Sequence, residues 1–300
     1  MYDLIGDLHG HADALEKLLQ QLGYEKRHGI YRHPDRQVIF LGDFIDRGPG
    51  ILETLEIVRP MIDGGAALAV MGNHELNALA YHTPDHSHPG EHLRPHHVKN
   101  VQQHAETLRQ VPAGELASYL EWFRTLPLWL ELEGLRAVHA CWDEARMAGI
   151  RGPISDEFLH AACSPGGRLF ESVEVILKGK EVRLPAGVTF RDKDGHERLA
   201  TRIKWYESPD GHTYRTYAMA SEPIDSDLPL PDEVARVAAP YPEDAQPVFV
   251  GHYWLRGSRP TLLRGNVACL DWSVAKGGFL CAYRWDGERA LDERKLVRTA

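Results

Sequence analysis

The sequence lacks the features that mark membrane proteins and proteins that bind nucleic acid in bulk. It has no apolar run long enough to cross a bilayer, and it begins Met1-Tyr2-Asp3 without a basic and apolar leader. Its 34 lysines and arginines are outnumbered by 43 acidic residues, for a net charge of -9, so no general basic surface is available to nucleic acid or anionic lipid. We therefore expect a cytoplasmic protein whose partners include neither a membrane nor bulk nucleic acid, although a nucleotide substrate is not excluded.

Cysteine is also scarce. The four cysteines form no CxxC pair and no disulfide-dense pattern, so we expect buried, reduced thiols at Cys141, Cys163, Cys269 and Cys281. The 300 residues do offer 43% apolar side chains, which is enough for one large domain or two modest ones.

Three times in the first hundred residues, an apolar strand leads into a polar turn that contains glycine and then into a helix. The strands and turns are Tyr2–Ile5 with Gly6–Gly10, Val38–Leu41 with Gly42–Pro49, and Leu68–Met71 with Gly72–Glu75. Apolar residues at helical spacing follow each turn, and Pro60 should end or kink the second helix. Strands that alternate with helices predict an α/β core.

Further strands are predicted at Leu128–Leu132, Leu135–His139, 247–250, 267–270 and 279–285, the first two of them as a hairpin. Residues 151–245 differ in character and include a predicted turn at Asp192–Gly195. We predict a single domain over 1–300, with a core of 1–150 and 246–300. The region at about 151–245 is expected to be an inserted, substrate-selecting cap of mixed, partly β structure.

A polar segment, His82–His104, carries seven histidines among prolines and glycines. We expect a long surface loop that takes up metal ions only adventitiously, because these histidines have no fixed ligand spacing on a regular element.

Six residues with metal-binding side chains lie at or just beyond the carboxyl ends of predicted strands: Asp7, His9, Asp43, Asn73, His139 and His252. In an α/β sheet this edge is where ligand sites assemble. Any one of the six could be a turn residue, a helix cap or a core histidine. Together, carboxylate, amide and imidazole groups are ligands for a borderline divalent metal such as Mn, Fe, Zn or Ni.

The segments Gly6-Asp7-Leu8-His9-Gly10, Gly42-Asp43-Phe44-Ile45-Asp46-Arg47-Gly48 and Gly72-Asn73-His74-Glu75 resemble, in order and spacing, the three signature motifs of calcineurin-like metallophosphoesterases. The form with Asp46-Arg47-Gly48 and His74-Glu75 is similar to the branch that holds serine/threonine phosphoprotein phosphatases and bacterial symmetrical diadenosine tetraphosphatases. The resemblance is strong over residues 1–80, moderate at Val138-His139 and Gly251-His252, and nearly absent from the insertion.

This resemblance implies two packed β-sheets flanked by helices, with two divalent metal ions at the sheet edge. Manganese is the expected metal, with iron, zinc or nickel as alternatives. The implied ligands are Asp7, His9 and Asp43 for the first metal, and Asp43, Asn73, His139 and His252 for the second. Asp43 would bridge the two ions, and a metal-activated water would attack phosphorus in line.

The resemblance also implies roles for three residues beside the metals. Arg47 would grip the phosphate oxygens through its planar fork. His74 would donate a proton to the leaving oxygen, and Asp46 would orient it. We interpret Glu75 as a helix cap or as a residue behind the ligands, and His11 as a helix start.

The sequence departs from the family pattern at two places. Many relatives continue the last motif as Gly-His-x-His, but here Gly251-His252 is followed by Tyr253-Trp254. Relatives in this branch often place two glycines after the ligand equivalent to His139, where this chain has Ala140-Cys141. The first metal therefore loses one possible ligand, and His139 has the weaker motif.

The natural substrate is not fixed by these motifs. A phosphoprotein phosphatase-like phosphomonoesterase is the first interpretation, and a symmetrical dinucleoside tetraphosphatase is the alternative. A regulatory module that binds metal without catalysis is disfavoured by the presence of Asp46, Arg47 and His74. Trp205 and Tyr206 could stack on a nucleobase, although aromatics in an apolar run more often belong to the core.

Overall fold

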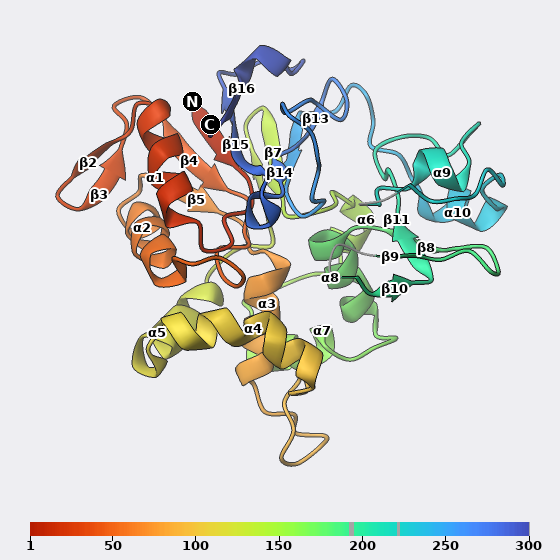
Figure 1. Ribbon diagram of the computed structural model, residues 1–300, viewed down its shortest axis with the longest axis horizontal. Coiled ribbons are helices and arrows are strands. Elements are labelled where there is room, and N and C mark those ends of the chain that lie inside the picture. Colours follow the sequence, from red (N-terminus) through yellow and green to blue (C-terminus); the bar gives the residue numbers. More distant parts are fainter. Residues whose placement is uncertain (192–194, 221–222, 300) are drawn as a thin grey trace.

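The computed structural model describes residues 1–191, 195–220 and 223–299, and within them two β-sheets form the centre of the protein (Figure 1). The first sheet has the order β14-β15-β1-β4-β5, with β16 also paired to β15. Its strands are β14 (Asp271–Trp272), β15 (Phe279–Trp285), β1 (Tyr2–Ile5), β4 (Gln37–Phe40), β5 (Ala67–Ala69) and β16 (Leu296–Arg298). The second sheet has the order β13-β12-β7-β6, with strands β13 (Val267–Cys269), β12 (Val248–Val250), β7 (Leu135–Val138) and β6 (Trp129–Leu132).

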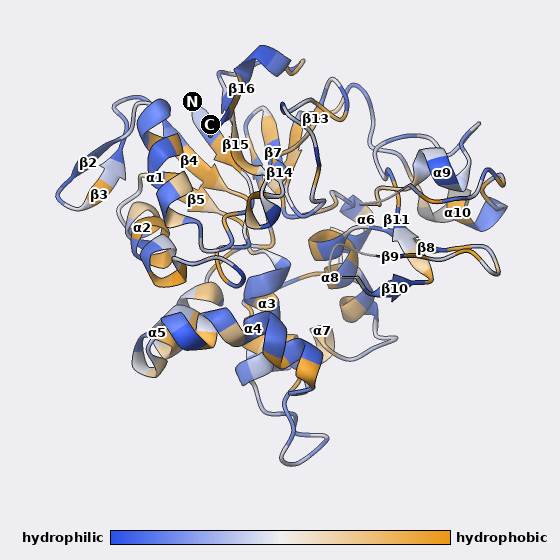
Figure 2. Cartoon of the chain, viewed as in Figure 1, coloured by the Kyte–Doolittle hydropathy of each residue, from blue (hydrophilic) through white to orange (hydrophobic). Residues whose placement is uncertain are grey.

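Alternate side chains of each strand enter two different parts of the core. Leu4 and Ile39 of the first sheet pack with Phe249 of the second in one buried cluster. Their neighbours Ile5 and Phe40 belong to another cluster, which contains the apolar faces of the helices. Because side chains alternate across a strand, both faces of these strands are covered and the sequence shows apolar runs. The central strands are accordingly hydrophobic in Figure 2, and the predicted pair of sheets flanked by helices is confirmed.

The predicted strand and helix repeats occur as parallel strands that end at one edge. Strands β1, β4 and β5 are parallel, and the register pairs Ile5 with Phe40 and Phe40 with Ala69. The helices that follow these strands are α1 (Ala12–Gln21), α2 (Ile51–Asp63) and α3 (Asn73–His82). Pro60 does not end α2, which continues to Asp63. The predicted hairpin is present as the antiparallel pair β6 and β7.

The segment predicted as one long loop, His82–His104, is only partly irregular. Its last seven residues begin α4 (Val98–Gln110), and α5 (Ala113–Phe123) follows. The prediction was wrong for residues 98–104 because the composition of the segment masks a helix whose buried face is polar. That face presents His104 and Thr107 to the rest of the protein.

Short elements make up most of the region predicted as an insertion. They are α7 (Asp156–Ala162), α8 (Arg168–Lys178), β8 (Glu181–Arg183), β9 (Phe190–Arg191), β10 (Glu197–Arg198), β11 (Ala200–Arg202), α9 (Tyr214–Tyr217) and α10 (Asp232–Val237). The short helix α6 (Glu144–Met147) precedes the region. A separate buried cluster in this region contains Val182, Ile203 and Tyr217. The predicted turn at Asp192–Gly195 falls largely on residues 192–194, outside the described residues. The boundaries of the insertion stay a prediction.

Trp205 and Tyr206 are buried in the main core at 1% and 2% exposure, so neither is available to stack on a nucleobase. Besides α4, elements that the sequence did not indicate include β16, the hairpin of β2 (Glu25–Arg27) and β3 (Ile30–Arg32), and the short helices η1 (Val274–Lys276) and η2 (Glu293–Lys295). Among the described residues, none of the helices has both the length and the apolar character that a membrane span requires.

Candidate active site

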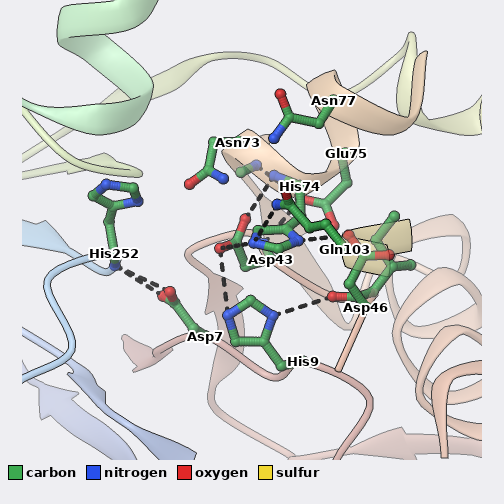
Figure 3. Close-up of polar contacts among 12 residues, drawn as sticks. Asp7, His9, Asp43, Asp46, Asn73, His74, Glu75, Asn77, Gln103 and His252 are labelled. Atoms are coloured by element: carbon green, nitrogen blue, oxygen red, sulfur yellow. Dashed lines mark hydrogen bonds and ion pairs between the residues drawn. The ribbon is translucent and has the colours of Figure 1, made fainter. Parts of the chain in front are cut away.

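The six predicted ligand residues lie together, buried, at the edge where the strands of both sheets end. Asp7 and His9 follow β1, Asp43 follows β4, and Asn73 begins α3 after β5. His139 directly follows β7, and His252 follows β12. Figure 3 shows Asp43 beside His74, with His9 below it and Asp7 and His252 to one side. The parallel register explains this convergence, because the strands end at one level.

Asp43 is the centre of this arrangement. One of its carboxylate oxygens, Oδ1, lies 3.4 Å from His139 Nε2, and the other, Oδ2, lies 3.5 Å from His9 Nε2 and 3.9 Å from His74 Nε2. Burial alone would raise the pKa of Asp43, but the imidazoles of His139 and His74 lower it well below its ordinary value. The carboxylate therefore stays ionised between the imidazoles that face its two oxygens.

The donor atoms fit divalent metal ions. Two groups of side chains each bring their ligand atoms within 4.8 Å of one another: His9 with Asp43 and His74, and Asp43 with His139 and His252. Asp43 is common to both groups, as expected of a bridging carboxylate. Nitrogen and oxygen donors of this kind suit borderline metals.

Two of the histidines have the orientation of metal ligands. Nδ1 of His9 faces the carbonyl of Ile45 at 3.1 Å, and Nδ1 of His139 faces the carbonyl of Leu41 at 2.6 Å. A proton on Nδ1 that is donated to a carbonyl leaves the Nε2 lone pair available to a metal. In both residues Nε2 is the atom that faces Asp43.

Asp7 and Asn73, two further predicted ligands, lie beside these two groups of side chains. Asp7 is in neither group of metal-competent side chains, and its carboxylate accepts the backbone N–H of His252 at 3.1 and 3.2 Å. Burial and the carboxylate of Asp271 raise the pKa of Asp7 well above its ordinary value. A nearby dication would favour the ionised form. Asn73 Oδ1 lies 3.1 Å from His139 Nε2, beside the second group.

The turns that carry the site adopt backbone conformations that side chains other than glycine rarely take. Left-handed φ values occur at His9 (42°), Asp43 (53°), Asp46 (66°), Arg47 (74°), His252 (71°) and Trp254 (53°). Such conformations cost free energy and persist where the surrounding structure holds them. One such support is Glu75, whose carboxylate accepts the backbone N–H groups of Asp43, Phe44 and Gly72 at 2.8, 2.8 and 2.9 Å, in line with its predicted capping role.

Two glycines are required by close approach. A Cβ on Gly72 would lie 2.3 Å from both the backbone nitrogen and Oδ1 of Asp43. A Cβ on Gly251 would lie 2.0 Å from Oδ1 of Asp7. Glycine at these positions lets the turn after one strand touch a carboxylate at the end of another, within the first sheet at Gly72 and between the two sheets at Gly251.

The predicted pair of His74 and Asp46 is formed. His74 Nδ1 lies 2.6 Å from Asp46 Oδ2, and both side chains are buried. Burial opposes ionisation of Asp46, but hydrogen bonds from His104 and His74 hold its pKa well below the ordinary value. Because Nδ1 is directed at Asp46, Nε2 of His74 is the atom that faces Asp43 and the open side of the site.

Arg47 lies against the ring of Trp254. Its guanidinium sits 4.8 Å from the ring centre of Trp254, and the same ring lies 5.3 Å from that of His9. An aromatic face attracts a cation and fixes its plane. Trp254 thus stands two positions after His252, where many relatives have a second histidine.

A cleft of about 620 Å³ opens onto Asp43, His74, Arg47 and Trp254. Its further walls come from the first half of α3, from α4 and from α8 to β11 of the predicted insertion. Cationic side chains on these walls are Arg94, Lys99, Lys178, Arg198 and Arg202. Glu174 and Glu181 lie among them.

Two residues that the sequence analysis passed over touch Asp46. His104 and Thr107, both on α4, lie 2.9 and 2.6 Å from its Oδ1. Their spacing of three residues, typical of one helix face, could have indicated them. The many histidines of segment 82–104 obscure this spacing.

Comparison with known proteins places these observations in a family. The model of the calcineurin-like phosphoesterases matches residues 2–253. A symmetrical bis(5'-nucleosyl)-tetraphosphatase of Actinobacillus succinogenes is 26% identical over 316 aligned positions, which cover 98% of this chain and 97% of the relative.

Shorter matches include two asymmetrical bis(5'-nucleosyl)-tetraphosphatases. That of Halalkalibacterium halodurans is 47% identical over 74 residues, 24% of this chain and 30% of the relative. That of Geobacillus sp. is 32% identical over 143 residues, 46% of this chain and 55% of the relative. The chain thus spans about a third to a half of these two relatives.

A solved structure with the same fold is a serine/threonine phosphatase from Saccharomyces cerevisiae with similarity to human phosphatase PP5. It is 14% identical, has a TM-score of 0.50, and the match covers 99% of this chain and 78% of that one. The family match over most of the chain agrees with the three motifs and with the buried carboxylate and imidazole groups at the strand ends. The chain belongs to the calcineurin-like phosphoesterase family.

Proposed function

We propose that the protein hydrolyses phosphate esters with the help of two divalent metal ions. The observation that carries this proposal is the position of Asp43, whose two carboxylate oxygens face His139 and His9 at 3.4 and 3.5 Å. We propose Asp7, His9 and Asp43 as ligands of one ion, and Asp43, Asn73, His139 and His252 as ligands of the other. Manganese is the metal we would test first, with iron, zinc and nickel next, and the cytoplasm is the proposed location.

The bound ions would activate a water molecule and neutralise charge on the phosphoryl group. The chain itself would bind the phosphate through Arg47, whose guanidinium is held by the ring of Trp254 at 4.8 Å. His74 would release a proton from Nε2 to the leaving oxygen, since its Nδ1 is directed at Asp46 at 2.6 Å. Asp46 would stabilise the charged imidazole and fix its orientation.

Two substrate classes are compatible with this centre. A phosphomonoester, including a phosphorylated protein side chain, needs only the metal centre and Arg47. A dinucleoside tetraphosphate is favoured by the near full-length similarity to a symmetrical bis(5'-nucleosyl)-tetraphosphatase and by the cations on the cleft walls. Such a substrate carries additional phosphates that Arg94, Lys178 and Arg202 could contact.

The first experiment compares hydrolysis of phenyl phosphate by metal-stripped and manganese-loaded protein. We expect manganese-dependent turnover that is abolished in Asp43→Asn, because the shared ligand is lost. In His74→Asn we expect a fall of roughly 100-fold with the metal still bound, because only the proton donor is removed. The exposed Asp35 supplies a matched control, Asp35→Asn, whose rate should equal that of the wild type.

Equal rates in all four proteins would refute the assignment of the site. A metal-loaded wild type that hydrolysed no phosphoester or anhydride would instead favour a module that binds metal without catalysis. Product analysis then separates the two substrate classes. Release of nucleoside diphosphate from diadenosine tetraphosphate would support the nucleotide, and rapid hydrolysis of a phosphopeptide without it would support the monoester.

A further inference from the structure

We propose that His104 and Thr107 of α4 are positioning residues, which hold Asp46 so that it can orient His74 for proton donation. This inference rests on the proposed function, because it concerns the proton that His74 would deliver. It assigns α4, a helix within and beyond the histidine-rich segment, a part in catalysis.

The contacts of Asp46 carry the inference. Its Oδ2 faces His74 Nδ1 at 2.6 Å, while its Oδ1 accepts from Thr107 Oγ1 at 2.6 Å and from His104 Nδ1 at 2.9 Å. The backbone N–H of Asp46 donates to the same Thr107 hydroxyl at 3.0 Å. Thr107 is fully buried and His104 is 4% exposed, so water does not compete for these bonds. Both the carboxylate and the backbone of Asp46 are therefore fixed from one side by α4.

The backbone at Asp46 needs such support. Asp46 and Arg47 are consecutive residues with left-handed φ values of 66° and 74°, which residues with a Cβ avoid. One turn further along α4, Gln110 donates to the carbonyl of Gly48 at 2.8 Å and accepts the N–H of Ile51 at 2.8 Å. Positions 104, 107 and 110 lie along one face of the helix. This face therefore hydrogen-bonds the turn after β4 both at Asp46 and at Gly48 to Ile51.

His104 has a second neighbour, which is compatible with the tautomer that Asp46 selects. Its Nε2 lies 3.3 Å from Nε2 of His82, at the end of α3. With Nδ1–H donated to Asp46, Nε2 of His104 can accept the N–H of His82. A chain of four side chains thus links His82, His104, Asp46 and His74, and each bond in it has a compatible donor and acceptor.

A purely structural role for α4 would make a different prediction from a positioning role. Damage to the turn as a whole would slow every substrate by a similar factor. An Asp46 side chain that is no longer held in place would impair proton donation by His74. Proton donation matters greatly for a poor leaving group such as an alkoxide and little for 4-nitrophenolate. The dependence of kcat on the leaving group therefore distinguishes the two roles.

The test measures kcat and KM of manganese-loaded protein with an alkyl phosphate and with 4-nitrophenyl phosphate. In His104→Leu and in the near-isosteric Thr107→Val, we expect kcat for the alkyl phosphate to fall roughly 10- to 100-fold. With 4-nitrophenyl phosphate we expect a fall of less than about 3-fold, and little change in KM for either substrate. His104→Asn and Thr107→Ser keep a donor near the original position and should restore most of the lost rate.

A matched control is Thr83→Val, because the buried Thr83 hydroxyl donates to the Leu79 carbonyl at 2.7 Å and has no contact with Asp46. It should leave the ratio of the two kcat values unchanged. In a His74→Asn background, the substitutions at positions 104 and 107 should have no further selective effect, because the group they position is gone.

Equal losses for both substrates, or the same selective loss without His74, would overturn the inference while the proposed function stands. A manganese-loaded wild type that hydrolyses neither of these two substrates nor diadenosine tetraphosphate would refute the proposed function instead. Thr107→Val removes only a hydroxyl, so it provides the test if His104→Leu does not fold.

Discussion

At the scale of single residues, burial and like charges decide which groups ionise. His82 lies at the end of α3, and burial together with the imidazoles of His104, His96 and His92 lowers its pKa to about 4. A histidine in the unfolded chain titrates near pH 6.5. Between these values the unfolded chain binds a proton that the folded protein does not bind at His82.

This difference predicts that His82 destabilises the protein at acidic pH. The free energy of unfolding should fall as the pH drops from about 6.5 toward 4, since the unfolded state gains protons over that interval. The contribution is reduced by solvent because His82 is only half-buried. Urea denaturation of the metal-free wild type and His82→Gln, repeated between pH 6.5 and 4, should show that the free energy of unfolding falls less with decreasing pH in the variant. Parallel curves for the two proteins would contradict the prediction.

At the scale of elements, the site depends on how closely the strand ends approach one another. The turn after β12 passes so near the turn after β1 that Gly251 has no room for a side chain, and His252 donates its backbone N–H to Asp7. The same closeness holds between the turns after β4 and β5 at Gly72. The two sheets therefore share the site through backbone contacts as well as through ligands.

We predict that Gly251→Ala destabilises the protein and weakens metal binding, because the new Cβ would lie 2.0 Å from Oδ1 of Asp7. Overpacking of this kind costs about 1 to 3 kcal/mol. The comparison is Gly114→Ala in α5, where a Cβ meets nothing within 4 Å and alanine favours the helix. Thermal unfolding and manganese titration should show losses only in Gly251→Ala. An unchanged manganese affinity would mean that Asp7 can move without consequence.

At the scale of the whole molecule, the packing of one sheet on the other holds the site together. Phe249 of β12 is fully buried between the sheets, and its ring lies 5.1 Å from that of Tyr283 in β15. Proposed metal ligands that follow strands of the first sheet, such as Asp43, face proposed ligands that follow strands of the second, such as His139, at 3.4 Å. Loss of sheet packing would therefore separate the proposed ligands of one sheet from those of the other.

Phe249→Ala should lower the free energy of unfolding by about 3 to 5 kcal/mol, since it removes buried contacts and leaves a cavity between the sheets. Leu228→Ala, at a side chain that is 55% exposed, should change it by less than about 0.5 kcal/mol. Urea denaturation with fluorescence detection measures both. A small effect at Phe249 would indicate that the sheets repack without it.

The sequence by itself determined the α/β core and brought Asp7, His9, Asp43 and Asn73 to attention, because each follows an apolar strand within a few residues. Strand, turn and helix are local patterns, and parallel strands bring their carboxyl ends to one edge whatever the rest of the chain does. The family match agrees with that interpretation. Local patterns did not indicate the hairpin of β2 and β3, whose strands are only three residues long.

Only the tertiary structure decided which side chains support the site. His104 and Thr107 are 58 and 61 residues from Asp46 in the chain, and Trp254 reaches Arg47 across a greater separation. Such contacts depend on how a helix packs across a turn, which periodicity does not encode. Burial likewise settled that Trp205 belongs to the core, because its environment comes from segments distant in the sequence.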